Sequence, residues 1–125
     1  MKMTILKCLK AYKAILELEN EKLDFSTAHT LVMGKRALEP HAEFYTEKER
    51  EIVEKYAIPD KDGNIFSPSG QFKMSANSTV DFKRDKAELD AVEVEVEIKG
   101  KIKSLPEVKP SVLDALLDVF EFSEG

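Results

Sequence analysis

The side chains of this chain that could carry out acid–base or nucleophilic chemistry are few, and their spacing matches no catalytic motif. A nucleophile needs a base and a group that orients the base. The two histidines, His29 and His41, stand twelve residues apart on a helical pattern, with no His-Glu-x-x-His pair and no Gly-x-Ser-x-Gly elbow in the sequence. His41 lies one turn before Tyr45 and is expected to pack or hydrogen-bond with it. The sequence therefore predicts no catalytic residue and no enzymatic activity.

The most tempting match to a metal-binding motif is residues 60–65, Asp-Lys-Asp-Gly-Asn-Ile, which resembles the middle of an EF-hand loop. The match fails at both ends, because the first ligand position would be Ile58 and the twelfth, which needs a bidentate glutamate, would be Ser69. A tight Asp-Gly turn explains the segment instead. The single cysteine, Cys8, can form neither an internal disulfide nor a zinc site and is predicted to fill the core. We expect no metal and no cofactor.

Charge and phosphate-binding patterns argue against a nucleic-acid partner. The chain has 24 acidic and 19 basic residues, a formal net charge of −5, and a field of this sign repels a phosphate backbone unless the cations are strongly segregated. Lys35 and Arg36 form an adjacent cationic pair, and Gly34 before them lacks the upstream glycine of a phosphate-binding loop. The glutamates between Glu39 and Glu54 are expected to form a solvated helix face. The sequence identifies no ligand-binding residue.

Two amphipathic helices are predicted for the first half of the chain. The first covers residues 3–19, and the second begins near Ser26 as its N-cap and ends before Pro59. Pro40 interrupts the second pattern, so this helix either kinks there or consists of two abutting helices. An unbroken helix would extend about 45 Å and overhang the core, so its apolar face would need cover from another chain. The predicted inner face of the second helix is Ala28, Leu31, Leu38, Ala42, Tyr45, Ile52 and Tyr56.

The segment after the second helix predicts an edge hairpin and a short helix. The hairpin pairs residues 65–66 with residues 71–74 around a turn at residues 68–70. A helix through about residue 90 follows, because Ser78 and Asp81 have the spacing of a capping box. Its buried residues are expected to be Phe82 and Leu89.

The clearest strand of the sequence covers residues 92–98, where apolar and charged residues alternate without error. One face of this strand, which carries Val92, Val94, Val96 and Ile98, should be buried. Gly100 allows a turn into residues 101–103, whose lysines would face the glutamates of the strand across an antiparallel pair. The last helix should begin at about Ser111 after Pro110, be capped on the spacing of Ser111 and Asp114, and bury Val112, Leu113, Leu116, Leu117 and Phe120.

These elements predict an α+β fold in one domain over residues 1–125. Residues 1–58 form a helical hairpin, and residues 59–125 form a β-rich part with two short helices. A small, mainly antiparallel sheet should pack against the two N-terminal helices and the C-terminal helix. No stretch approaches about 18 consecutive apolar residues, and the N-terminus lacks the apolar region of a signal peptide, so we expect no contact with a membrane.

The order of these features resembles that of a known group of proteins. The features are two N-terminal helices with a helix end at residues 54–57, the Asp-Gly turn at residues 62–63, the strand at residues 92–98 and a last helix that opens with residues 110–113. This layout is similar to that of small uncharacterised proteins of tailed bacteriophages and prophages of Gram-positive bacteria, and the similarity spans nearly the full chain. It implies a phage gene product without enzymatic activity, in the cytoplasm of a bacterial host or in the virion, and it supplies no functional residues.

Two functions follow as expectations. The first is a non-enzymatic interaction or assembly protein that docks on itself, as a homo-oligomer, or on a larger phage or host protein. The overhanging second helix motivates it. The alternative is a phage counter-defence protein, either an acidic inhibitor that mimics nucleic-acid charge or a sponge for a nucleotide signal. Net charge supports the inhibitor, and Lys35 with Arg36 is the only local support for the sponge.

Overall fold

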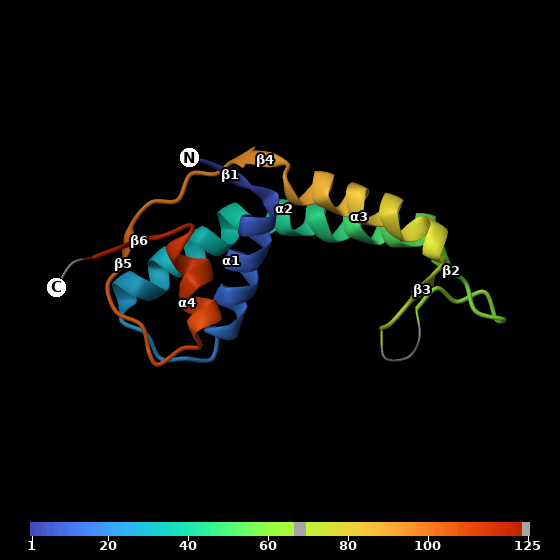
Figure 1. Cartoon of the computed structure of the whole chain (residues 1–125). Helices are drawn as coiled ribbons and strands as arrows, with labels where there is room; N and C mark the ends of the chain where they lie inside the picture. The colour runs from blue at the N-terminus through green and yellow to red at the C-terminus, as the bar shows by residue number, and fades with distance from the viewer. Residues whose placement is uncertain (67–69, 124–125) are drawn as a thin grey trace.

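The structure is an α+β fold in which a mainly helical body carries a long two-helix arm (Figure 1). A computed structural model describes residues 1–66 and 70–123. The expected helical hairpin, long second helix, mainly antiparallel strands and C-terminal helix are confirmed. In chain order the elements are β1 (Lys2–Thr4), α1 (Ile5–Glu17), α2 (Phe25–Tyr56), β2 (Ala57–Ile58), β3 (Lys73–Met74), α3 (Ala76–Asp90), β4 (Glu93–Glu95), β5 (Lys101–Ile102), α4 (Pro110–Leu117) and β6 (Glu121–Phe122).

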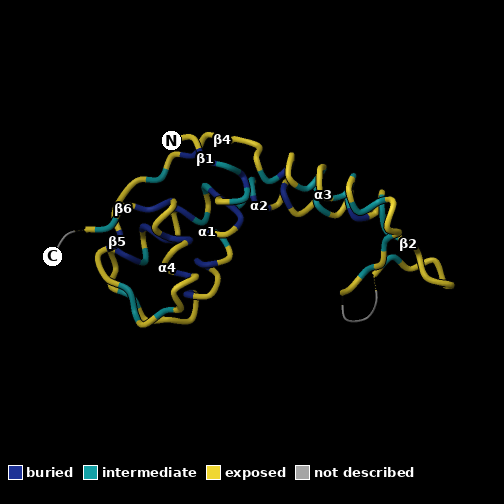
Figure 2. Tube along the Cα trace, in the orientation of Figure 1, coloured by how far each residue is buried: buried dark blue, intermediate teal, exposed yellow. Residues whose placement is uncertain are grey.

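The core of the body lies where α1, α4 and the first half of α2 meet (Figure 2). Cys8, Leu38, Ile102 and Leu116 are completely buried there, so Cys8 fills the core as predicted. Burial raises the pKa of the Cys8 thiol to about 11, which keeps the thiol protonated and unreactive near neutral pH. A second, smaller cluster joins α1 to the first part of the arm and consists of Ile5, Leu9, Ala42, Tyr45 and Leu89.

α2 is one continuous helix of 32 residues that passes through Pro40. Figure 1 shows the helix bending in its middle part, which contains Pro40, as expected where a proline removes a backbone hydrogen bond. The second half of α2 leaves the body, and α3 lies alongside it to form the arm. The expected overhang is therefore present, but α3 of the same chain covers one side of it.

The N-cap of α2 is Asp24, so the prediction of Ser26 is wrong. The Asp24 carboxylate accepts a hydrogen bond from the backbone N–H of Thr27 at 3.1 Å. A carboxylate at this position satisfies a free N–H of the first turn and also interacts favourably with the positive end of the helix. The hydroxyl of Ser104 donates to the other oxygen of Asp24 at 2.9 Å, so the same cap fixes the loop that follows β5.

The cap should make stability depend on pH in the acid range. Hydrogen bonds, first those from Thr27 and then that from Ser104, hold the pKa of Asp24 below its ordinary value. Because the folded-state pKa is lower, the stabilisation is present above the unfolded-state pKa and is lost as pH falls through the folded-state pKa. We expect Asp24→Ala to lower the melting temperature near neutral pH, and the difference from wild type to shrink below about pH 4. Circular dichroism melts across this range test it, with Asp24→Asn as the uncharged-cap control. A difference that stays constant with pH would contradict the assignment.

β4 pairs with the N-terminus of the chain, and the predicted hairpin across Gly100 is wrong. β4 runs antiparallel to β1, with Lys2 opposite Glu95. β1 escaped prediction because its three residues are too few to display a period of two, and two of them, Met3 and Thr4, fall within the predicted first helix. The predicted alternation is largely correct, because Val96 is buried, Val94 and Ile98 are half-buried, and their acidic neighbours are exposed. Val92 is the exception, since it is 40% exposed.

Two buried threonines of α2 hold the segment of β5 away from β4. The Thr27 hydroxyl oxygen accepts hydrogen bonds from the backbone N–H groups of Lys103 at 3.1 Å and Ser104 at 3.3 Å. The Thr30 hydroxyl donates to the carbonyl oxygen of Lys101 at 3.3 Å. β5 then pairs in parallel with β6, so the strands in the described part of the chain form three separate two-stranded pairs. Neither threonine belongs to the predicted inner face of α2, because an apolar periodicity does not register buried polar residues.

The tip of the arm differs from the predicted edge hairpin. β3 pairs antiparallel with β2, with Ala57 opposite Met74, whereas residues 65–66 form no strand. β2 is extended because Pro59 disfavours a helical conformation in the residue before it. Two residues of the turn predicted at residues 68–70 lie outside the described residues. A chain of aromatic contacts packs the tip against the arm and contains Tyr56, Phe82, Phe72 and Phe66.

The capping boxes predicted at Ser78 and Ser111 are not formed. α3 begins at Ala76 and α4 at Pro110, and no side-chain hydrogen bond caps either helix. α4 can begin earlier because a proline suits the first helical position. On the predicted inner faces Leu89, Val112, Leu116 and Phe120 are buried, Phe82 is half-buried, and Leu113 and Leu117 are exposed.

Candidate functional site

The two histidines both lie on α2, and among the described residues neither meets another reactive side chain in a catalytic arrangement. His29 is exposed, and its ring stacks on Phe25 with 6.2 Å between ring centroids. His41 is half-buried, and Tyr45 directs its hydroxyl to Asp90 of α3 at 2.5 Å instead of to His41. Within residues 1–66 and 70–123, no group of three or more His, Cys, Asp or Glu side chains could hold a metal ion.

The EF-hand-like segment is a turn closed by its own first carboxylate. Oδ1 of Asp60 accepts hydrogen bonds from the backbone N–H of Asp62 at 2.8 Å and of Asn64 at 2.9 Å. Gly63 has a φ of 81°, the left-handed conformation that favours glycine. The predicted Asp-Gly turn is therefore confirmed.

A polar cluster between α2 and α3 was not predicted from the sequence. The Lys86 ammonium donates hydrogen bonds to Glu49 and, at 2.6 Å, to the hydroxyl of Tyr45, which itself donates to Asp90. Burial raises the pKa of Tyr45. Burial alone would lower the pKa of Lys86, but its hydrogen bonds to Glu49 and Tyr45 outweigh this effect and raise the pKa. Both groups therefore keep their protons near neutral pH, and the cluster holds α3 against α2 in the arm. Its signal in the sequence is weak, because the pairs that cross between helices are separated by 37, 41 and 45 residues.

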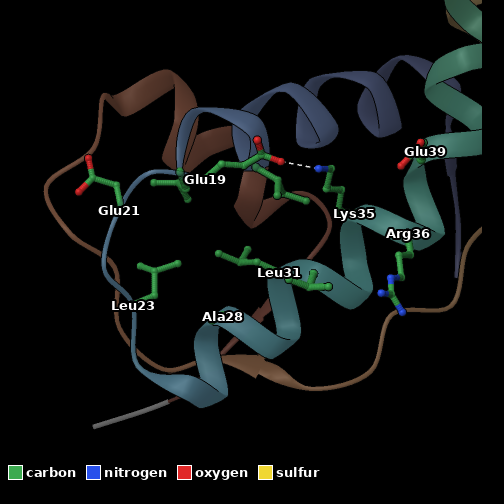
Figure 3. A pocket seen from close by; sticks show the side chains of 11 residues that line it. Glu19, Glu21, Leu23, Ala28, Leu31, Lys35, Arg36 and Glu39 are labelled. Atoms are coloured by element: carbon green, nitrogen blue, oxygen red, sulfur yellow. Dashed lines mark hydrogen bonds and ion pairs between the residues drawn. The ribbon is translucent and has the colours of Figure 1, made fainter.

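A cleft of about 520 Å³ opens in the body (Figure 3). The first half of α2 forms one side of it, and the end of α1 and the loop after α1 form the other. Residues from three consecutive parts of the chain line it, because the loop after α1 folds back along α2. Figure 3 shows an ion pair between Lys35 and Glu19 across one side of the cleft. Its apolar lining is Ile15, Leu18, Leu23, Ala28, Leu31 and Val32, and its charged lining is Glu19, Glu21, Lys35, Arg36 and Glu39.

The charges of this cleft do not converge on an anion. Two cations and three carboxylates line it, and the Lys35 ammonium is already bound by the carboxylate of Glu19. That hydrogen bond raises the pKa of Lys35 above its ordinary value. A phosphate group is held by several donors that point at it together. The pair Lys35 and Arg36 is thus brought to a cleft, but with carboxylates beside it, and the lining suits apolar side chains better than a nucleotide.

An exposed row of side chains continues from the cleft along α2. At 100° per residue, Phe25, His29, Val32 and Arg36 fall on one side of the helix, opposite the buried Gly34 and Leu38, and Met33 lies beside them. Phe25 is 85% exposed, and Val32 and Met33 are exposed as well. Val32 and Arg36 belong to both the row and the cleft. We call the cleft and the row together the α2 face.

The α2 face is the site that sequence analysis missed. Its apolar residues are ordinary members of a helical pattern, and only the outward position of Phe25, Val32 and Met33 distinguishes them. Lys35 and Arg36 were singled out for a different reason, their adjacent charges. The cleft also depends on the path of residues 18–24, which no local pattern predicts.

Comparison of the chain with models of protein families, with curated proteins and with solved structures finds no match. The described helices include none with both the length and the apolar composition that a membrane span requires.

Proposed function

We propose that this chain is a non-enzymatic interaction or assembly protein, of the phage-derived kind that its layout resembles, and that it docks through the α2 face. The observation that carries the proposal is the exposed apolar row, above all Phe25, which lies on the side of α2 that faces away from the core and borders the partly apolar cleft between α1 and α2. Contiguous exposed apolar surface of this sort marks interaction sites, whereas single exposed residues do not.

The first partner that this face fits is a second copy of the chain. Two copies of α2 packed antiparallel about a twofold axis between residues 30 and 31 would place Phe25 of one copy over Arg36 of the other, and His29 over Val32. The contact of a guanidinium with an aromatic ring is favourable, and the twofold axis makes it occur twice. The face is therefore complementary to itself through guanidinium–aromatic and apolar contacts.

The oligomeric state in solution tests this proposal. We expect multi-angle light scattering to give a mass near twice 14.1 kDa at high concentration. Phe25→Lys and Val32→Lys should weaken dimerisation at least about tenfold, because the first places an ammonium group against Arg36 of the other copy and the second places one in the apolar contact. Val80→Lys is the matched control, since Val80 is 73% exposed on α3 and lies outside the α2 face. A wild-type chain that stays monomeric at about 1 mM would contradict self-docking, and so would equal effects of all three substitutions.

The counter-defence alternative receives less support. A nucleotide sponge would need free cations in the cleft, but Glu19 engages Lys35, and Glu21 and Glu39 add further negative charge. The acidic inhibitor is supported by the net charge of −5, although several carboxylates of the arm are paired with lysine or arginine. A nucleotide that raised the melting temperature of the protein would favour the sponge, because a ligand of the folded state must stabilise it.

A further inference from the structure

β4 has one free edge on the surface of the body, and this edge is separate from the α2 face. Among the described strands only β1 pairs with β4. Figure 1 shows β4 on the outside of the molecule next to the N-terminus, and Figure 2 shows the chain there as mostly exposed. A free edge presents unpaired backbone groups that can pair with another strand.

The hydrogen bonds between β1 and β4 define which groups point to the free edge. Val96 donates its N–H to the carbonyl of Met1 at 3.0 Å and accepts from the Met1 amine at 3.2 Å, and the N–H of Ile5 donates to the carbonyl of Val92 at 2.7 Å. In an antiparallel pair, consecutive residues direct their backbone groups alternately to the two sides. Since the valines face β1, Glu93 and Glu95 direct their N–H and C=O groups to the free edge.

The side chains next to this edge form one acidic row and one apolar row. Glu93, Glu95 and Glu97 are exposed on the outer face. Within the described residues, their ionic contacts are those of Glu95 with the N-terminal amine at 3.0 Å and of Glu97 with Lys99 at 3.8 Å. On the inner face, Val92 is exposed and Val94 is half-buried, so apolar surface remains open beside the strand.

We propose that the free edge of β4 binds an extended segment of another protein in which lysine or arginine alternates with apolar residues. An added antiparallel strand would place its basic side chains opposite the glutamates and its apolar side chains against Val92 and Val94. A second copy of β4 is excluded from this edge, because it would bring glutamates opposite glutamates. The acidic row therefore selects a basic strand, and this site operates whether or not the α2 face forms a dimer.

The direct probe is an eight-residue peptide of alternating lysine and valine with blocked termini, titrated into the full-length protein by calorimetry. Two peptides of the same composition serve as controls. One carries its lysines and valines in two blocks, and the other is methylated on the backbone nitrogens of its lysines. The lysines stand opposite Glu93 and Glu95, so their N–H groups are the ones that pair with β4, whereas methylation of the valine nitrogens leaves pairing intact. We expect the block and lysine-methylated peptides to bind at least about tenfold more weakly.

Variants of the protein separate pairing at the edge from attraction by net charge. Replacing Glu93 and Glu95 together by lysine should weaken binding of the alternating peptide at least about tenfold, with a shallower salt dependence. Glu88→Lys with Glu107→Lys changes net charge equally at exposed positions outside β4 and should leave binding within about twofold. The proposal is overturned if the alternating peptide does not bind, if lysine methylation has no effect, or if both double variants weaken binding equally. Dimer formation by light scattering is unaffected by any of these outcomes, so a failure here is distinguishable from a failure of the α2 face.

Discussion

Val96→Asp is expected to lower the free energy of unfolding by about 4 kcal/mol or to prevent folding altogether, because it puts an unpaired charge into the core. Val96 is only 3% exposed and belongs to the main apolar cluster of the body. Its backbone is also paired with Met1 on both hydrogen-bonding groups, so the strand cannot rotate the new carboxylate to solvent without losing that pair. Denaturant unfolding followed by circular dichroism measures the effect.

Neighbouring positions of the same strand provide the controls for this experiment. Val92→Asp should cost much less than Val96→Asp, since Val92 is 40% exposed. Glu95→Lys should change stability by less than about 1 kcal/mol, because its ion pair with the N-terminal amine is exposed. If Glu95→Lys proved more damaging than Val96→Asp, the register of β4 would be wrong by one residue.

The strand pattern shows what the sequence could and could not predict about the fold. The alternation at residues 92–98 identified the buried face from local information, because the period of a strand is carried by its own residues. The partner of the strand lies about 90 positions away in the sequence, and β1 is too short to show a strand pattern of its own. The competing partner, β5, is removed by the hydroxyls of Thr27 and Thr30, whose hydrogen bonds span more than 70 residues.

The helices were predicted better than their ends. Apolar spacing located α1 and α2 and anticipated the overhang, since each depends on contacts repeated over many turns. The N-caps were misplaced because several polar residues near each start could serve, and tertiary contacts decide between them. At α2, for example, Asp24 is favoured over Ser26 because Ser104 also binds its carboxylate.

The candidate site was harder to predict than the fold. The search for histidine and phosphate chemistry in the sequence singled out His29, Lys35 and Arg36, which all lie on the α2 face, but these residue types do not mark an apolar docking surface. It is defined by exposure, and exposure follows from which side of α2 the body covers. The free edge of β4 is similar: the glutamates are visible in the sequence, but their availability follows from the position of β5.

Gly34→Val is expected to destabilise the body by about 3 kcal/mol, because the body has no room for a side chain at this position. A Cβ placed on Gly34 would lie 2.5 Å from Cε1 of the Phe120 ring and closer still to Cζ. Phe120 is itself buried in the main cluster, so its ring cannot swing away without disturbing the core. Gly34→Ala should cost about 1–2 kcal/mol, since its gain in helix propensity of about 1 kcal/mol offsets part of the overlap.

A double-mutant cycle with Phe120 separates this close contact from a backbone effect. Phe120→Leu alone leaves a cavity and should cost about 1 kcal/mol or more. In the Gly34→Val background, Phe120→Leu provides room for the valine side chain. The cost of Phe120→Leu should therefore fall or reverse there, which gives a coupling energy of at least about 1 kcal/mol. Thermal and denaturant unfolding of the four proteins measure the cycle. If the costs are simply additive, the ring of Phe120 does not fill the space above Gly34, and the glycine is required for another reason.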